Sequence, residues 1–172
     1  ENISPYMKDA IVAIEDERFY THKGFDLRRT TKAALMFAKS KLTGSDITFG
    51  GSTITQQLVK NITDRRDETA ARKILEISSA VNLEKKISKD KILELYLNSI
   101  YLSQGCSGIQ SASYKFFGKP VSELNLAECA SIAGITQYPS RYDPLVNPEN
   151  NKEKQEVVLA KMLELGFISQ EE

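Results

Sequence analysis

Apolar residues recur at helical spacing along most of the chain, and this pattern predicts an all-helical or nearly all-helical fold. Met7, Ala10, Ile11 and Ile14 follow Ser4-Pro5, where serine predicts a cap and proline the first helical residue. Polar and turn residues separate this segment from further periodic segments. We expect these further helices from Asp26 to about Lys41, after Thr53, from Thr69, from Lys89 to about Tyr101, at 109–117, at 127–135 and from Asn147 to Gly166. No convincing strand alternation occurs.

Two of these helices have a predicted inner face, and two others have predicted caps. The second helix is expected to bury Leu27, Ala34, Leu35 and Ala38, and Thr53 with Gln56 forms a capping box at the third. A second capping box comes from Asn125 and Glu128. The helix from Lys89 has an apolar face formed by Ile92, Leu93, Tyr96, Leu97 and Ile100.

Amino-acid composition says little about binding partners, but it indicates how many domains the chain can form. The 172 residues are 41% hydrophobic, enough for one core, so residues 1–172 are predicted to form a single domain. The 23 basic residues balance the 23 acidic ones, and we expect no nucleic-acid partner. No apolar run is long enough to span a membrane, and the abrupt ends suggest a domain of a longer protein. Cys106 and Cys129 are interpreted as small buried hydrophobes rather than a disulfide.

Catalytic-type residues are densest from Glu15 to Gly24. Glu15 and Asp16 end an apolar helical stretch, and His22 is the only histidine of the chain. Glu15 comes four residues after Ile11, so it should lie at the edge of the buried stripe, where partial desolvation favours a proton-accepting carboxylate. His22 is interpreted as a brace for this segment rather than a proton-transfer group.

The segment that follows Gly50-Gly51 combines hydroxyl and amide groups at a helix N-terminus. Such a helix N-terminus can bind an anion or a carbonyl oxygen. The alternative is an ordinary helix cap, which would explain Thr53 and Gln56 but not the further hydroxyl and amide groups of Ser52, Thr55 and Gln57. Just before it, residues 43–51 carry Ile47 and Phe49, which either fold into the core or belong to a flap that touches lipid or a long apolar substrate.

A cationic cluster is predicted further along the chain. Arg72 and Lys73 lie four and three residues before Glu76, so their charged groups should converge on one side of a helix. The alternative is an ordinary exposed salt bridge. Lys60 adds to the basic residues of this region, where a phosphate could bind.

In order, these motifs resemble the peptidoglycan glycosyltransferase domain, glycosyltransferase family 51, of class A penicillin-binding proteins and monofunctional transglycosylases. The similarity covers essentially the whole chain. The motifs that carry it are Glu15-Asp16-x-x-Phe19-x-x-His22-x-Gly24, Gly51-Ser52-Thr53-Ile54-Thr55-Gln56-Gln57, Arg72-Lys73-x-x-Glu76 and Ile92-Leu93-Glu94-x-Tyr96-Leu97-Asn98.

The resemblance implies a lysozyme-like helical domain with a cleft between two lobes, working at the outer face of the bacterial cytoplasmic membrane. The implied reaction joins lipid II to a growing glycan chain with inversion and release of undecaprenyl pyrophosphate. A C-terminal transpeptidase domain is a further implied possibility, as is inhibition by moenomycin, which binds the donor site of family members.

The resemblance also implies residue roles. Glu15 and Glu76 match the family's two glutamates, Glu15 as the base, and a divalent cation, Mg²⁺ or Mn²⁺, is a candidate ligand of Glu76. Arg72 and Lys73 would stabilise the leaving pyrophosphate. The other substrate-binding candidates are Asp16, His22, Ser52, Thr53, Thr55, Gln56, Gln57, Lys60, Glu94 and Asn98, of which Glu94 and Asn98 are interpreted as wall and scaffold.

Two alternative functions and three departures from the family pattern stay open. A lysozyme-like hydrolase would use Glu15 as an acid but would need neither Arg72 nor Lys73, and a non-catalytic glycan or lipid II binding module would tolerate loss of Glu15. Lys154 stands where the family usually has arginine, and it lacks the bidentate fork. Ser103 and Ser107 stand where the family often has glycine and an aromatic residue.

Overall fold

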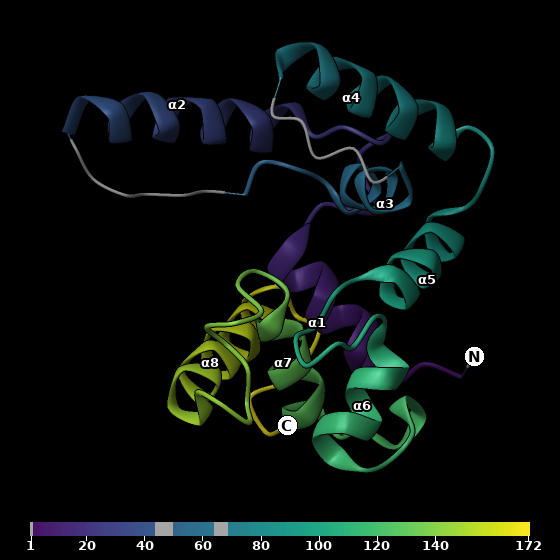
Figure 1. Cartoon of the computed structure of the whole chain (residues 1–172), viewed down its shortest axis with the longest axis vertical. Coiled ribbons are helices and arrows are strands. Elements are labelled where there is room, and N and C mark those ends of the chain that lie inside the picture. Colours follow the sequence, from purple (N-terminus) through teal and green to yellow (C-terminus); the bar gives the residue numbers. More distant parts are fainter. Residues whose placement is uncertain (1, 44–49, 64–68) are drawn as a thin grey trace. The chain divides into compact units, whose positions relative to one another are not determined.

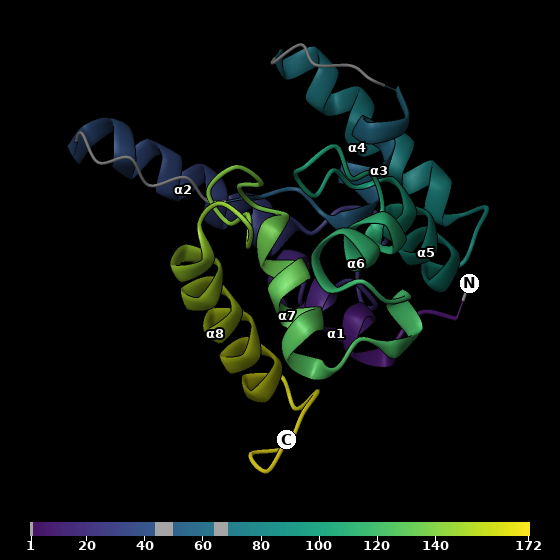
Figure 2. The ribbon, with the colours of Figure 1, turned by 60° about the horizontal axis from the view of Figure 1, so that its bottom comes forward.

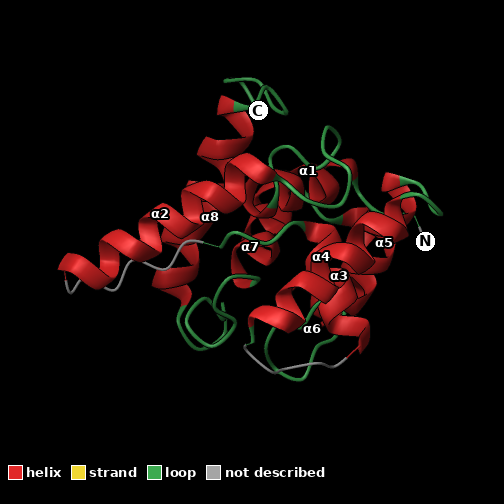
Figure 3. Cartoon of the chain, turned by 90° about the horizontal axis from the view of Figure 1, so that it is seen from above, coloured by secondary structure: helices red, strands yellow, loops and turns green. Residues whose placement is uncertain are grey.

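The computed structural model describes residues 2–43, 50–63 and 69–172, and these ranges contain helices and loops but no strand (Figure 3). The all-helical prediction is therefore confirmed. The elements, labelled in Figure 1, are α1 (Pro5–Glu15), α2 (Leu27–Thr43), α3 (Ile54–Thr63), α4 (Ala70–Glu84), α5 (Lys89–Ser99), α6 (Ile109–Phe117), η1 (Val121–Glu123), α7 (Leu126–Ile135) and α8 (Pro148–Glu164). Among the described helices, none is both long and apolar enough to cross a membrane.

The chain divides into two compact units, and it passes from one to the other after Glu17 and again inside α5. Unit 1 comprises residues 1–17 and 93–172, and unit 2 comprises residues 18–92. In unit 1, α7 packs against both α1 and α8, and the views of Figures 1 and 2 agree on this arrangement. In unit 2, α3 packs against α4.

The core of unit 1 forms around α7 because this helix is built of small residues. Every residue from Cys129 to Ile135 is buried. Gly134 allows an especially close approach, since a Cβ there would lie 2.9 Å from Lys154 Cγ on α8. The Asn125 and Glu128 capping box is present, with Asn125 Oδ1 accepting from the Glu128 N–H at 2.9 Å and Glu128 Oε2 accepting from the Asn125 N–H at 2.8 Å.

The predicted apolar face of α5 is confirmed, and so is the state of the cysteines. Ile92, Leu93, Tyr96 and Leu97 are at most 1% exposed, and Ile100, which follows the last residue of α5, is 5% exposed. Cys106 and Cys129 are both free and buried. Burial raises the pKa of the Cys129 thiol to about 11, so this cysteine is an inert core residue at neutral pH.

The structure corrects two local expectations at helix starts and faces. Ser4 is the N-cap residue of α1, but its hydroxyl makes no cap; instead, its oxygen accepts the Cys129 S–H at 3.8 Å. On α2, Leu27 and Leu35 are 66% and 72% exposed rather than buried, and Ala34 is exposed as well. Helical spacing identifies an apolar face but not whether another element covers it. The Ala38 side chain lies outside the described part.

The turn after α5 has an unusual backbone. Ser103 and Gln104 have φ values of 69° and 49°, a region that side-chain-bearing residues seldom adopt. Asp143 stabilises this backbone conformation through two hydrogen bonds: its Oδ2 accepts from Ser103 Oγ at 2.7 Å and from Gln104 Nε2 at 2.6 Å. The departure from glycine at position 103 is thus accompanied by a hydrogen bond that glycine could not make.

Candidate active site

Glu15 is the last residue of α1, and it is buried, with 7% of its surface exposed. Its Oε1 accepts a hydrogen bond from Thr136 Oγ1 at 2.6 Å. Asp16, which caps α1, is fully buried. The expectation that Glu15 lies at the edge of the apolar stripe and is desolvated is confirmed, because Met7, Ala10 and Ile11 of the same helix are in the core.

Lys154 contributes a cation to the surroundings of Glu15. It projects from α8, is buried, and donates from Nζ to Gln137 Oε1 at 2.7 Å. Burial lowers the pKa of Lys154, while the negative charge of Glu15 acts in the opposite direction. The position that departs from the family pattern therefore retains a positive charge within electrostatic reach of Glu15.

His22 belongs to a cluster of charged side chains in unit 2. Its Nδ1 lies 3.3 Å from Lys89 Nζ and 3.8 Å from Glu84 Oε1. Glu84 Oε1 also accepts from Lys89 Nζ at 2.7 Å, and Lys89 Nζ lies 4.4 Å from the centre of the buried Phe19 ring. Such a fixed environment suits the predicted bracing role of His22.

The row of hydroxyl and amide groups before and within α3 is largely used inside unit 2. Thr53, Thr55 and Gln56 are fully buried, and the predicted capping box is present in both directions. Thr53 Oγ1 donates to the Gly24 carbonyl at 2.9 Å, and Thr55 Oγ1 donates to Glu84 Oε1 at 2.5 Å. Gly24, with φ +83°, leaves no space for a Cβ, which would lie 2.7 Å from the Ala80 backbone.

The remaining members of this segment are more accessible. Ser52 and Gln57 are half-buried and Lys60 is exposed. These three residues are therefore better placed to touch a ligand directly than Thr53, Thr55 and Gln56. Residues 44–49, with Ile47 and Phe49 of the predicted flap, lie outside the described residues.

The predicted convergence on Glu76 is confirmed. Arg72 Nη1 donates to Glu76 Oε2 at 3.1 Å, and Lys73 Nζ pairs with Glu76 Oε1. Gln56 Nε2 donates to Glu76 Oε1 at 3.3 Å. Since Glu76 is 6% exposed, the alternative of an ordinary exposed salt bridge is wrong for this carboxylate.

Lys73 joins this cluster to the segment before α3. Its Nζ also donates to Ser52 Oγ at 2.8 Å, and its side chain is 37% exposed. Ser52 and Glu76 thus share one ammonium group, and Gln56 joins them through its hydrogen bond to Glu76. The cluster presents a cation to solvent over a buried carboxylate, which is an arrangement that can bind an anion.

The surroundings of Glu76 do not fit a divalent cation. Mg²⁺ prefers several oxygen ligands, whereas this carboxylate accepts from two cations and an amide N–H. Among the described residues, no group of three or more His, Cys, Asp or Glu side chains could hold a metal ion. A role for Mg²⁺ or Mn²⁺ stays a prediction without a site on these residues.

Glu94 and Asn98 lie on α5 in unit 1 and differ in exposure. Glu94 is half-buried and Asn98 is exposed. The Asn98 backbone has a close neighbour: a Cβ at Gly108 would lie 2.7 Å from the Asn98 carbonyl oxygen. This packing against a glycine gives α5 a structural role at the position predicted to be scaffold.

The residues of these networks that were not predicted from the sequence include Glu84, Lys89, Thr136 and Asp143. Glu84 and Lys89 flank the turn between α4 and α5, where opposite charges five residues apart carry no clear signal. Thr136 lies far in sequence from Glu15, and Asp143 lies far from Ser103 and Gln104. Only the fold brings these partners together.

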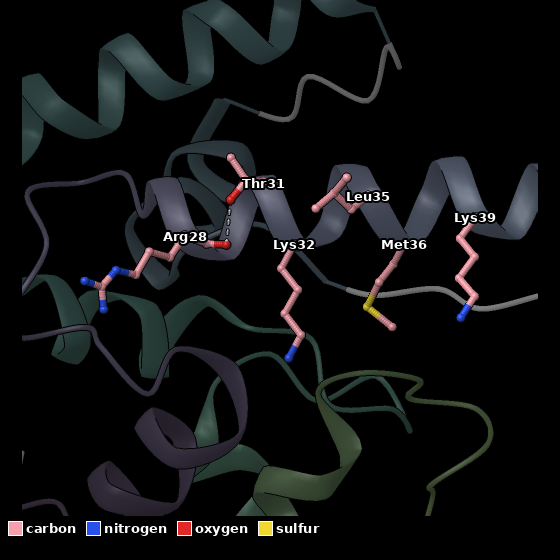
Figure 4. Close-up of a pocket in the computed structure, with 6 residues that line it drawn as sticks. All are labelled: Arg28, Thr31, Lys32, Leu35, Met36 and Lys39. Atoms are coloured by element: carbon pink, nitrogen blue, oxygen red, sulfur yellow. Dashed lines mark hydrogen bonds between the residues drawn. The ribbon is translucent and has the colours of Figure 1, made fainter.

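The surface of α2 combines exposed apolar and basic side chains. Figure 4 shows Lys32, Met36 and Lys39 projecting from one side of the helix, with Leu35 on another. The Thr31 hydroxyl donates back to the Arg28 carbonyl at 3.0 Å, so it is satisfied within the helix. This surface, Arg28, Thr31, Lys32, Leu35, Met36 and Lys39, is called the α2 surface below.

Residues 1–163 match the family model described as Transglycosylase, and the chain belongs to this family. The resemblance seen in the sequence is therefore confirmed, and the chain is an enzyme of the peptidoglycan glycosyltransferase class.

Its relatives include penicillin-binding protein 1A of Clostridium perfringens, 46% identical over 100% of this chain and 26% of the relative. Penicillin-binding protein 1F of Bacillus subtilis is 43% identical over 99% of this chain and 23% of the relative. A Cupriavidus necator protein with transglycosylase in its name is 44% identical over 95% of this chain and 68% of its own length. The chain thus spans about a quarter of the two penicillin-binding proteins.

Proposed function

We propose that this chain polymerises lipid II into glycan strands by inverting glycosyl transfer, with release of undecaprenyl pyrophosphate. Glu15 accepts the proton of the attacking sugar hydroxyl. The observation that carries this proposal is the buried Glu15 carboxylate, which is hydrogen bonded by Thr136 and within electrostatic reach of Lys154. A general base needs this kind of fixed, desolvated position.

The cluster around Glu76 supports the pyrophosphate part of the proposal. Arg72 and Lys73 stabilise the charge that develops on the leaving group, and Glu76 orients both cations through its two oxygens. Ser52, Gln57 and Lys60 contact sugar or phosphate. A glycan hydrolase releases a sugar rather than a pyrophosphate, so it has no use for this pair of cations.

The remaining candidates support these groups. Thr53, Thr55 and Gln56 hold the start of α3 in place, and Asp16 and His22 brace the segment after α1. Glu94 and Asn98 form the wall and scaffold along α5. These roles predict that conservative substitutions of Thr53 and Thr55 reduce the stability of the fold more than they reduce the affinity for substrate.

The proposed setting is the outer face of the bacterial cytoplasmic membrane, where lipid II is consumed. The exposed leucines and lysines of α2 suit contact with lipid, because apolar side chains and cations together bind anionic bilayers. The names of the two penicillin-binding relatives, and the quarter of their length that this chain spans, favour a longer protein with a transpeptidase domain.

The test uses labelled lipid II and two glutamate variants. Glu15→Gln keeps the side-chain shape and should abolish polymerisation, whereas Glu17→Gln should not. Glu17 is the matched control because it is two residues away and pairs with Lys161 Nζ at 2.8 Å with 34% of its side chain exposed. Polymer formed by the unmodified chain should be sensitive to moenomycin. Polymerisation by Glu15→Gln at near the unmodified rate would refute Glu15 as the base.

A further inference from the structure

We propose that Thr136 is the positioning residue of the catalytic base: its hydroxyl holds Glu15 Oε1 and supports the carboxylate before and after proton uptake. This inference rests on the proposed function, in which Glu15 is the base. The Thr136 Oγ1 to Glu15 Oε1 distance is 2.6 Å, within the range of a charge-assisted O–H···O⁻ hydrogen bond.

The backbone fixes the Thr136 hydroxyl where it can act. Thr136 is the C-cap residue of α7, with φ −54° and ψ −37°, and its N–H donates to the Ala133 carbonyl at 3.3 Å. Because α7 packs directly against α1, the end of one helix presents a hydroxyl to the end of the other. A β-branched side chain has few rotamers, so this geometry costs little entropy.

The hydroxyl has two acceptors but a single proton. Thr136 Oγ1 lies 2.6 Å from Glu15 Oε1 and 2.8 Å from the Ala133 carbonyl oxygen. With Glu15 ionised, the proton points to the carboxylate. When Oε1 carries the proton taken from the substrate hydroxyl, Glu15 donates a hydrogen bond to Thr136 Oγ1. The Thr136 hydroxyl then donates its own proton to the Ala133 carbonyl oxygen. No heavy atom has to move between the two states.

The charged groups around Glu15 act differently from this hydroxyl. Lys154 faces Glu15 from α8, and its interaction is electrostatic rather than directional. Lys161, also on α8, is paired with Glu17 and Glu164, while Asp16 follows Glu15 in the chain. On α7, Glu128 is held at the opposite end by the Asn125 N–H and Lys119. Thr136 therefore supplies a directed hydrogen bond that this set of charges does not provide.

The first test compares two substitutions in the pH profile of lipid II polymerisation. Thr136→Val keeps the shape and removes the hydroxyl, whereas Thr136→Ser keeps the hydroxyl. Thr136 hydrogen bonds both forms of Glu15, but the bond to the ionised carboxylate is charge-assisted and therefore stronger, so Thr136→Val should move the acidic limb of kcat/KM up by about half a pH unit to one pH unit. Thr136→Ser should keep the unmodified profile. A purely structural role would lower the rate without moving this limb.

The second test does not depend on catalysis. The chain is labelled with glutamate carrying ¹³C at the carboxyl carbon, and the Glu15 signal is assigned by its absence in Glu15→Gln. In Thr136→Val the midpoint of this signal's titration should rise by the same amount as the kinetic limb. An unchanged midpoint in Thr136→Val would overturn the inference. A shifted midpoint together with active Glu15→Gln would support the hydrogen bond but refute the proposed function.

Discussion

Lys73 Nζ donates to Ser52 Oγ at 2.8 Å and pairs with Glu76 Oε1, so one ammonium group joins the segment before α3 to the first half of α4. Lys73 and Ser52 are 21 positions apart and come from different sequence motifs. The lysine side chain remains 37% exposed, so its charge can still reach a ligand. A residue that only stabilised α4 would not need this second partner.

Loss of Lys73 should therefore impair catalysis more than folding. We expect Lys73→Ala to lower kcat/KM for lipid II about a hundredfold, the order found when one group that stabilises developing charge is removed. Lys73→Arg should recover part of the loss. Lys152→Ala is the control, because Lys152 and Glu156 also form a helical ion pair, but both side chains are 64% exposed. Equal effects of Lys73→Ala and Lys152→Ala would make Lys73 an ordinary surface residue.

Spacing along one helix predicts some of these interactions and misses others. Glu76 with Arg72 and Lys73, and both capping boxes, were predictable because their partners lie three or four residues apart on one helix. Thr136 with Glu15 was not, because 121 positions separate the two groups. The exposure of Leu35 was also missed, since the sequence pattern of α2 does not show that its apolar face is left uncovered.

Glu84 should matter for stability, although it lies outside the predicted motifs. Its side chain is 6% exposed, and it accepts from Thr55 and Lys89. Glu84→Ala removes a buried partner of both residues, so we expect a loss of about 2–4 kcal/mol in the free energy of unfolding. Chemical denaturation measures this loss. Glu156→Ala, at an exposed pair, should change stability by less than about 0.5 kcal/mol, and a similarly small value for Glu84→Ala would contradict the buried cluster.

We expect Asp143 to make a pH-dependent contribution to the free energy of unfolding. Burial opposes its ionisation, but the Ser103 hydroxyl, the Gln104 amide and the N–H groups of Leu145 and Val146 together hold its pKa below the ordinary 3.8. The unfolded chain therefore binds this proton more readily. The stabilisation is present above the unfolded value and is lost as pH falls through the folded pKa.

Asp143→Ala should accordingly lower the free energy of unfolding by about 2 kcal/mol at neutral pH, and by less as the pH falls below about 3. Ser103→Gly is the matched control. It removes one donor but relieves the strained backbone at φ 69°, so the two effects should largely offset each other. A difference between Asp143→Ala and the unmodified chain that stays constant from neutral to acid pH would disprove the assigned role of the carboxylate.

The α2 surface should bind anionic bilayers. Leu35 is 72% exposed and belongs to the same surface as Lys32 and Lys39, so insertion of the leucine and attraction of the lysines act together. Leu35→Ser replaces three apolar carbons with a hydroxyl group, and we expect its partition coefficient on vesicles containing phosphatidylglycerol to fall by at least about tenfold. Lys32→Glu should lower partition at low salt and have a smaller effect at high salt.

The control for this experiment is Leu145→Ser, which alters a leucine that is 56% exposed in unit 1. This variant should partition like the unmodified chain if binding is specific to the α2 surface. Neutral phosphatidylcholine vesicles separate the two contributions, because they should retain the leucine effect and lose the lysine effect. Equal losses for Leu35→Ser and Leu145→Ser would mean that general exposed apolar area, rather than the α2 surface, drives attachment. Unchanged binding of Leu35→Ser would remove α2 from the membrane-contact proposal while leaving the chemistry of Glu15 untouched.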